Sequence, residues 1–148
     1  MATLFLICGL PGAGKSTVAR QIEAEHHALR LTADEWMARI VGDGFDADRR
    51  AAVQAVQCDI AMRILGLGVN VVLENGFWHR AERIELRERA HAIGADTRLL
   101  FLDAPRDELL RRLEARNRVL PPDTFPVTTE QLDLYTTWFE PPLADELV

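Results

Sequence analysis

The stretch Gly9-Leu10-Pro11-Gly12-Ala13-Gly14-Lys15-Ser16 decides the fold of this chain. It follows an apolar run at 4–8 that is typical of a buried strand, and it leads into 17–22, which has the pattern of a helix start. Glycine, four residues and Gly-Lys-Ser between a strand and a helix form a phosphate-binding loop. Its glycines permit a tight turn whose N–H groups face an anion, and the helix N-terminus attracts the same anion. We therefore expect the run from Gly9 to Thr17 to bind a nucleotide.

The basic residues sharpen this interpretation. Lys15 is the single lysine of the chain, whereas every other basic residue is arginine. Lysine acts on phosphate as a flexible point charge, so a chain that otherwise uses arginine has its one lysine where this chemistry needs it. We expect Lys15 to reach the β- and γ-phosphates of ATP and the Ser16 hydroxyl to bind Mg²⁺. The alternative is a glycine-proline turn followed by an incidental lysine.

Length and composition are those of a globular domain, with 148 residues, 48% hydrophobic and 27% charged. We expect one domain over 1–148. No apolar run approaches the roughly 20 residues of a membrane span, and no signal peptide is recognisable, so we expect a cytoplasmic protein without a membrane partner. Cys8 and Cys58 form no disulfide or metal pattern. The segment 119–148 holds six acidic and no basic residues, so charge does not favour nucleic acid as a partner.

Strand-like and helix-like segments alternate along the chain. Apolar runs predict strands at 4–8, 28–32, 69–73 and 99–102, and helical patterns lie between and after them, at 14–27, 33–41, 48–65, 80–93, from 105 and at 128–139. This alternation predicts an α/β, three-layer P-loop NTPase fold, in which helices flank a small parallel sheet. No apolar strand follows Pro142, so we expect about four strands and a missing fifth.

Several local patterns predict helix ends and buried faces. The spacing of Thr32 and Glu35, and that of Thr128 and Gln131, predicts two capping boxes. Helical periodicity predicts that the helix at 48–65 buries one apolar stripe, and we expect two aromatic residues near the end of the chain to lie in the core. These residues are Val53, Val56, Ile60 and Ile64 in the stripe, and Trp138 and Phe139 in the core.

Polar residues follow the predicted strands. Asp34, Glu74 and Asp103 each lie at or just after a strand end, where ligands bind in parallel sheets. Aromatic residues follow the third strand in Phe77-Trp78-His79-Arg80 and would suit an apolar or planar small molecule. Aromatic residues at the edge of the core are the alternative. We expect Trp36, Trp78 and Arg80 to line a substrate pocket.

The phosphate loop together with Asp34, at the start of the helix after the second strand, resembles small P-loop kinases. The pattern is similar to the kinase domains of polynucleotide 5′-kinases, chloramphenicol phosphotransferase and zeta-type toxins. The arginine-bearing helix 111–118 looks like their lid, which we expect around 111–126. The helix 128–138 and the run Phe139-Glu140-Pro141-Pro142 look like an ATP-binding group beside these kinases.

The resemblance implies catalytic roles for three kinds of residue. Asp34 would be the general base that accepts the proton of an acceptor hydroxyl. Arg116, and next Arg112 or Arg118, would bind the phosphates and neutralise the transition state. Glu74 looks like a Walker-B carboxylate that holds Mg²⁺ through water, although many relatives have the shorter aspartate there, and Asp103 could take more of that role. The alternatives are a helix-capping acid, solvated arginines in surface ion pairs and a strand-end acid.

These observations favour an ATP- and Mg²⁺-dependent phosphotransferase that acts on a hydroxyl of a small molecule. A polynucleotide 5′-kinase is an alternative, but such kinases place an arginine soon after the base. Here the neighbours of Asp34 are Trp36 and Met37, and Arg39 lies a turn further. A nucleotide-binding regulatory protein without phosphoryl transfer is the second alternative, favoured by the missing strand and by Glu74.

Overall fold

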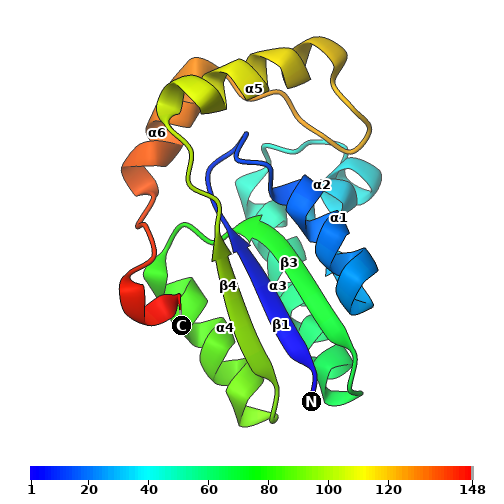
Figure 1. Cartoon of the computed structure of the whole chain (residues 1–148). Helices are drawn as coiled ribbons and strands as arrows, with labels where there is room; N and C mark the ends of the chain where they lie inside the picture. Colours follow the sequence, from blue (N-terminus) through cyan, green and yellow to red (C-terminus); the bar gives the residue numbers. More distant parts are fainter. Residues whose placement is uncertain (148) are drawn as a thin grey trace.

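A computed structural model describes residues 1–147 of the chain, which form a parallel sheet with helices on both faces (Figure 1). The strands β1 (Thr3–Cys8), β2 (Ala28–Leu31), β3 (Asn70–Gly76) and β4 (Asp96–Phe101) lie in the order β2-β3-β1-β4, all parallel. The helices are α1 (Lys15–His26), α2 (Ala33–Trp36), α3 (Ala47–Gly66), α4 (Arg80–Ala92), α5 (Arg106–Val119) and α6 (Thr129–Trp138). The predicted α/β P-loop fold with a small parallel sheet is confirmed. Residue 148 of the expected domain lies outside the described residues.

Alternate side chains of the strands pack on opposite faces of the sheet. One face packs on α3 and α4 through a cluster that contains Leu4, Leu6, Ala61, Leu65, Val71, Leu73, Leu86 and Ala90. The other face packs on α1 through Phe5, Ile7, Ala19, Ile22, Ala28 and Val72. Because strand side chains alternate with a period of two, these clusters produce three layers with the sheet in the middle (Figure 1).

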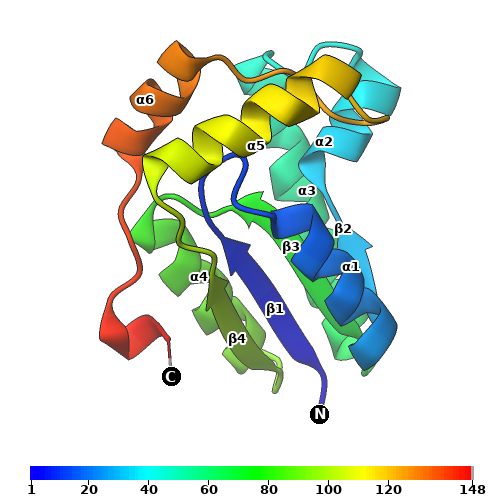
Figure 2. The ribbon, with the colours of Figure 1, turned by 45° about the horizontal axis from the view of Figure 1, so that its top comes forward.

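The helices α5 and α6 cover the carboxyl end of the sheet. Figure 2 shows α5 lying across the segment that follows β1, with α6 beside it. A third apolar cluster joins these helices to the phosphate loop through Ala13, Leu109, Leu113 and Leu132. The lid-like helix therefore rests directly on the loop that it was expected to cover. None of the helices within 1–147 is long and apolar enough to cross a bilayer.

The predicted helix at 33–41 is a short α-helix followed by a π-helical turn, η1 (Met37–Val41). The N–H of Gly42 donates to the carbonyl of Met37 at 2.8 Å and ends this turn. Thr32 stands at the N-cap of α2, but its side chain makes no capping hydrogen bond, so the first predicted capping box is wrong. The second is confirmed, because Gln131 N donates to Thr128 Oγ1 at 3.1 Å and Thr128 N donates to Gln131 Oε1 at 2.9 Å.

The expected stripe of α3 is confirmed in part, since Ile60 and Ile64 pack against the core, but the centre of the buried face is rotated by one residue. Gln57, Ala61 and Leu65 are the buried residues of this helix, while Val56 is half exposed. A buried hydrogen bond explains the rotation, since Gln57 Nε2 donates to the carbonyl of Thr32 at 3.0 Å and brings a polar residue inward.

The expectation for the end of α6 is wrong in part. Trp138 is 47% exposed, because α6 packs through Leu132 and turns its last residues toward a cavity. Phe139 is half-buried, with its ring 5.7 Å from that of Phe101. Cys8 is buried and Cys58 is half-buried, and both thiols are free as expected.

Candidate active site

The phosphate loop has the backbone conformation that an anion site requires. Gly12 and Gly14 have φ angles of +84° and +94°, a backbone conformation that residues other than glycine rarely adopt. Gly14 is the N-cap of α1, no side chain caps this helix, and its first turn contains no acidic residue. The first N–H groups of α1 are therefore free to bind a phosphate. Gly9 N donates to Gly76 O at 3.0 Å and ties the loop to the end of β3.

Close packing of α5 gives a second reason for glycine at position 12. A Cβ atom on Gly12 would lie 3.0 Å from both the carbonyl oxygen of Leu109 and the Cγ atom of Leu113. The guanidinium of Arg112, on the same helix, donates to Gly12 O at 3.4 Å. The lid-like helix thus brings an arginine to the loop.

Lys15 is folded against its own loop. Its Nζ atom donates to the carbonyl of Leu10 at 2.9 Å. Burial lowers the pKa of Lys15 to about 8, although the negative charges of Glu74 and Asp34 raise it, and the positive charge of Arg116 lowers it further. A half-buried ammonium with two carboxylates in its field is suited to an added polyanion, because the phosphates would favour its charged form.

Glu74, two residues before the end of β3, joins Ser16 to the partly buried Arg30. Ser16 Oγ donates to Glu74 Oε1 at 3.0 Å, and Arg30 donates Nη2 to Oε1 at 3.0 Å and Nε to Oε2 at 3.2 Å. The Ser16 hydroxyl and the Glu74 carboxylate are hard oxygen donors at the loop, so they fit Mg²⁺. Because Arg30 binds both carboxylate oxygens, a metal-bound water is the better partner for Glu74. Among residues 1–147, no group of three or more His, Cys, Asp or Glu side chains could hold a metal by itself.

Asp34 lies in the first turn of α2 and forms an ion pair. Arg50 Nη2, on α3, lies 2.8 Å from Asp34 Oδ1 and also donates to the carbonyl of Gly44 at 2.8 Å. The Asp34 side chain remains half exposed. Arg50 therefore orients the carboxylate while one face of Asp34 stays accessible.

The three predicted lid arginines lie in different environments. Arg116 is half-buried, donates Nη2 to the carbonyl of Phe125 at 3.4 Å and has a buried Nε without a partner. Burial lowers the pKa of Arg116, and the charge of Asp34 acts in the opposite direction. Arg112 contacts the loop and pairs with Glu108 at 2.8 Å. Arg118 pairs with the exposed Glu114 at 2.8 Å. Only Arg112 and Arg116 are thus placed toward the site.

A cavity of about 670 Å³ opens beside the phosphate loop. Pro11 and Lys15 line it together with Asp34 and Glu74. We call it the aromatic cavity, because its walls also contain Phe45, Phe77, Trp78, Phe125, Tyr135 and Trp138. Its volume lies within the range of about 300–1,000 Å³ that is usual for small-molecule sites.

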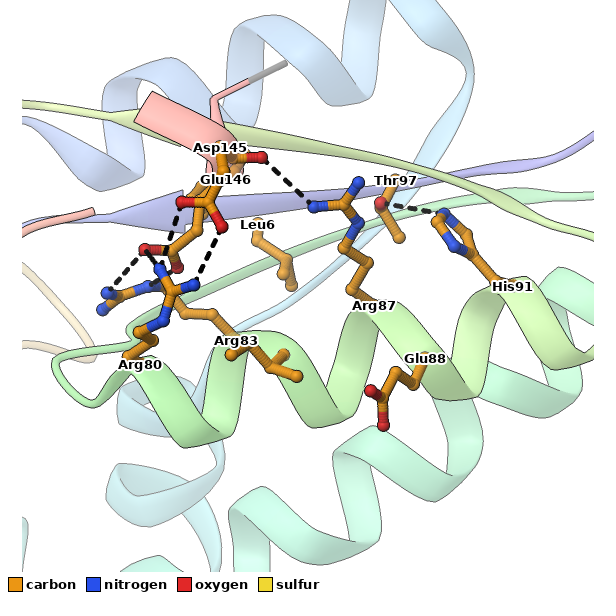
Figure 3. Close-up of a pocket in the computed structure, with 11 residues that line it drawn as sticks. Leu6, Arg80, Arg83, Arg87, Glu88, His91, Thr97, Asp145 and Glu146 are labelled. Carbon is orange, nitrogen blue, oxygen red and sulfur yellow. Dashed lines mark hydrogen bonds and ion pairs between the residues drawn. The ribbon is translucent and has the colours of Figure 1, made fainter. Parts of the chain in front are cut away.

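One of the three predicted pocket residues lines this cavity. Trp78 does, and its Nε1 atom donates to the carbonyl of Gly9 at 3.0 Å. Trp36 instead packs against the core, because the short α2 turns it toward the sheet. Arg80 lines a separate cavity of about 250 Å³ beside α4, where it pairs with Asp145 and Glu146 at 2.8 Å each (Figure 3). Acidic residues far along the chain therefore draw Arg80 away from the loop.

Sequence reasoning missed the arginine partners and four of the six aromatic residues that line the cavity. Arg30 stands in the strand Ala28–Leu31, and a charged residue inside a short apolar strand is a signal for a buried ion pair. Arg50, Phe45 and Phe125 carry no such signal, because their role depends on contacts across the fold. Tyr135 contacts Trp78 only because α6 folds back over the site, with ring centroids 4.9 Å apart.

Comparison with known proteins extends the resemblance. The sequence profile described as AAA domain (AAA_33) matches residues 4–142. No curated protein matches the chain in sequence. A gluconokinase from Sinorhizobium meliloti 1021 superposes with a TM-score of 0.69 at 19% identity, covering 97% of this chain and 78% of that one.

Two further solved structures are similar. The APS kinase CysC of Mycobacterium tuberculosis, in complex with AMPPNP and APS, has a TM-score of 0.63 at 25% identity and covers 80% of this chain and 74% of that one. A chain of the Pnkp1/Rnl/Hen1 RNA repair complex has a TM-score of 0.68 at 20% identity, covering 93% of this chain and 43% of that one. The fold is therefore that of P-loop kinases.

Proposed function

The chain belongs to the AAA domain family of P-loop proteins, and we propose that it is a kinase that transfers the γ-phosphoryl group of ATP to a hydroxyl of a small molecule. One observation carries the proposal. Lys15, suited to phosphate, and Asp34, suited to accept a proton, line the same cavity. A gluconokinase and an APS kinase among the similar structures support it.

The loop would bind the triphosphate from one side. The free N–H groups at the start of α1 and the Lys15 ammonium bind the β- and γ-phosphates. Ser16, and Glu74 through water, would hold Mg²⁺, which when bound neutralises charge on these phosphates. Arg112 and Arg116 stabilise the negative charge of the transferred group. The Arg112 guanidinium already contacts the loop at Gly12 O, and Arg116 has a buried Nε–H without a partner.

Asp34 would act on the acceptor. The acceptor oxygen forms a bond to the γ-phosphorus as the bond from that phosphorus to the bridging oxygen of ADP breaks, and the hydroxyl proton passes to the Asp34 carboxylate. Arg50 keeps the carboxylate oriented through the ion pair at 2.8 Å. Asp34 is therefore the residue whose loss should separate nucleotide binding from transfer.

The test compares D34N and K15A with the parent protein. We expect D34N to bind MgATP with unchanged affinity but to lose at least about a hundredfold of acceptor-dependent ADP release. K15A should lose affinity for MgATP itself. Acceptor-dependent release that survives in D34N would reject Asp34 as the base, and no Mg²⁺-dependent affinity of the parent for ATP would reject the kinase.

A regulatory protein that binds ATP without transfer is a second candidate. The observation in its favour is that both site carboxylates, Asp34 and Glu74, are in ion pairs with arginine. It predicts MgATP binding without ADP release for any acceptor. A polynucleotide 5′-kinase, suggested by the likeness to the RNA repair complex, predicts phosphate transfer to a 5′-hydroxyl oligonucleotide instead.

A further inference from the structure

Aromatic side chains are concentrated in the aromatic cavity. The chain contains six Phe, three Trp and one Tyr, and six of these ten residues line this cavity. They come from separate parts of the chain, and two of them lie on α6. Core packing accounts for Phe77, which is buried, but not for Phe45 and Trp138, which stay about half exposed.

Five of the six rings form two groups. On α6 and after β3, Tyr135 lies 4.9 Å from Trp78 and 5.7 Å from Trp138 between ring centroids. Before α3 and after α5, Phe45 and Phe125 lie 6.0 Å apart in an edge-to-face arrangement. All three separations are within the range of about 4.5–7 Å that aromatic pairs prefer. The groups are therefore ordered by contacts of their own, so a ligand would meet a preformed surface.

Two of these rings are left open to the cavity. Phe45 is 49% exposed and Trp138 is 47% exposed, although both line a concave surface. Each aromatic side chain can bury about 150–250 Å² of surface. A planar ligand between the groups would bury the part that folding leaves exposed, and that burial would favour binding.

The charged groups of the cavity argue against an anionic acceptor. Its cationic side chains are Lys15, which serves the phosphate loop, and Arg50, which is bound by Asp34 and Gly44. His79 also lines the cavity, with its Nδ1 3.1 Å from Glu140 Oε1. Among the described lining residues, no further cation is present to bind a carboxylate or phosphate of the acceptor.

The polar groups that remain suit a neutral ligand. Asn75 Oδ1 is buried, lines the cavity through its residue and has no hydrogen-bond partner. The carboxylate of Glu82 and the amide of Gln54 lie on the same cavity. A hydroxyl or N–H of a neutral ligand would find acceptors in the Glu82 carboxylate and the Gln54 amide oxygen.

Resting on the proposed function, the geometry points to an uncharged alcohol with an aromatic or heteroaromatic ring as the acceptor. The ring lies against Trp138, Tyr135 and the Phe45–Phe125 pair, and the hydroxyl faces Asp34. The transfer is that of the proposed kinase, with the hydroxyl proton taken by Asp34 and ADP as the leaving group.

The first experiment measures binding to the parent protein saturated with MgAMPPNP. Calorimetric titrations use uridine and 2-naphthylmethanol as aromatic alcohols, and glucose and gluconate as a neutral and an anionic alcohol without a ring. We expect at least about tenfold tighter binding of the aromatic alcohols. Equal or tighter binding of glucose or gluconate, or binding of none of the four, would overturn the assignment.

The second experiment uses a matched pair of variants on α6. Leu134 is 47% exposed like Trp138 but does not line the cavity, so W138L and L134A make comparable surface changes. We expect W138L to weaken binding of 2-naphthylmethanol about tenfold and to leave MgATP affinity unchanged, while L134A changes neither. Equal effects of the two variants would place the ring elsewhere.

The outcomes separate the acceptor class from the kinase itself. ADP release with glucose or gluconate and none with the aromatic alcohols would leave the kinase standing and reject the aromatic acceptor. Tight binding of the aromatic alcohols that depends on Trp138, without any ADP release, would support the ligand class and reject the kinase.

Discussion

Two arginine–glutamate pairs, one partly buried and one fully buried, join different regions of this molecule and differ in what else each carboxylate contacts. Arg30 and Glu74 join β2 to β3 with side chains 14% and 5% exposed. Arg83 and Glu146 join α4 to the last turn, η2 (Ala144–Glu146), with side chains 2% and 6% exposed and Nε 2.6 Å from Oε1. Glu74 of the first pair lines the aromatic cavity, whereas both members of the second pair line the smaller cavity beside α4.

The difference lies in the remaining hydrogen bonds. Glu74 accepts its third hydrogen bond from Ser16, a residue of the phosphate loop. Glu146 accepts from Arg80 at 2.8 Å and from Leu143 N at 2.8 Å, and Figure 3 shows Glu146 and Asp145 among the arginines of α4. The first carboxylate therefore has a partner that a metal–nucleotide complex would engage, whereas the second is satisfied wholly by the fold.

The Arg83–Glu146 pair also contacts the backbone beside the candidate site, at Phe77. Arg83 Nη1 donates to the carbonyl of Phe77 at 2.7 Å, and Phe77 has a φ angle of +50°. Positive φ is costly for a residue with a side chain, by about 1 kcal/mol or more, so other contacts must hold it. We infer that Arg83 and Glu146 stabilise the turn that places Trp78 on the aromatic cavity.

The largest expected effect comes from breaking the second pair. E146A leaves Arg83 buried without its carboxylate and should lower the free energy of unfolding by about 3 kcal/mol. Urea unfolding measures this change, and D145A, at an exposed neighbour, is the matched control with a much smaller effect. Equal losses for the two variants would show that the buried pair is no stronger than a surface pair.

The loss of stability at low pH provides a second measurement of the Arg83–Glu146 pair. Burial raises the pKa of Glu146, but hydrogen bonds from Arg83 and Leu143 and the charges of Arg83 and Arg80 outweigh it, so the pKa lies below the usual 4.5. A lowered carboxyl pKa means stability that is present above pH 4.5 and lost as the pH falls through the lower folded-state value. In E146Q, the free energy of unfolding should depend less on pH in this acid range, which urea unfolding at several pH values measures.

The next effect should come from breaking the first pair. R30M leaves the Glu74 carboxylate with Ser16 as its remaining side-chain donor and should cost about 2 kcal/mol of stability, less than E146A because this pair is only partly buried. The double variant R30M/E74M should recover most of that stability, since two apolar residues replace two charges. If R30M/E74M also bound ATP with the Mg²⁺-dependent affinity of the parent protein, a metal role for Glu74 would be contradicted.

A third prediction uses the ammonium beside the first pair. Because the pKa of Lys15 is about 8, the free protein loses its positive charge at this residue as the pH rises from 7 to 9. Binding of a triphosphate requires the charged form, so affinity for MgATP should fall by about tenfold, or about 1.4 kcal/mol, over this interval. Calorimetry at both pH values checks this, and E146Q should show the same fall.

The smallest effect is expected at an exposed arginine–glutamate pair. Arg118 and Glu114 are 73% and 70% exposed, so R118A should change the free energy of unfolding by no more than about 0.5 kcal/mol. It should also leave MgATP affinity unchanged, whereas R116A should weaken it. A loss of affinity in R118A equal to that in R116A would show that α5 moves when nucleotide binds.

Much of the site was predictable because it depends on short stretches. The loop from Gly9 to Ser16 contains its own turn and helix start, Asp34 follows the end of β2, and Glu74 lies in the last part of β3, next to an apolar run. The capping box at Thr128 and Gln131 was predictable for the same reason. The box at Thr32 failed, because the Thr32 side chain makes no capping bond and the Glu35 carboxylate lies 3.9 Å from Arg30 and from Arg39 instead.

The sequence by itself determined the phosphate loop, the four-stranded parallel sheet and the strand ends where polar residues gather, because local spacing and apolar periodicity encode each of them. Only the tertiary structure decided which charges pair and which rings share a cavity. Arg30 meets Glu74 across 44 residues and Arg83 meets Glu146 across 63. Contacts over such separations depend on how the helices pack on the sheet, and no local pattern specifies them.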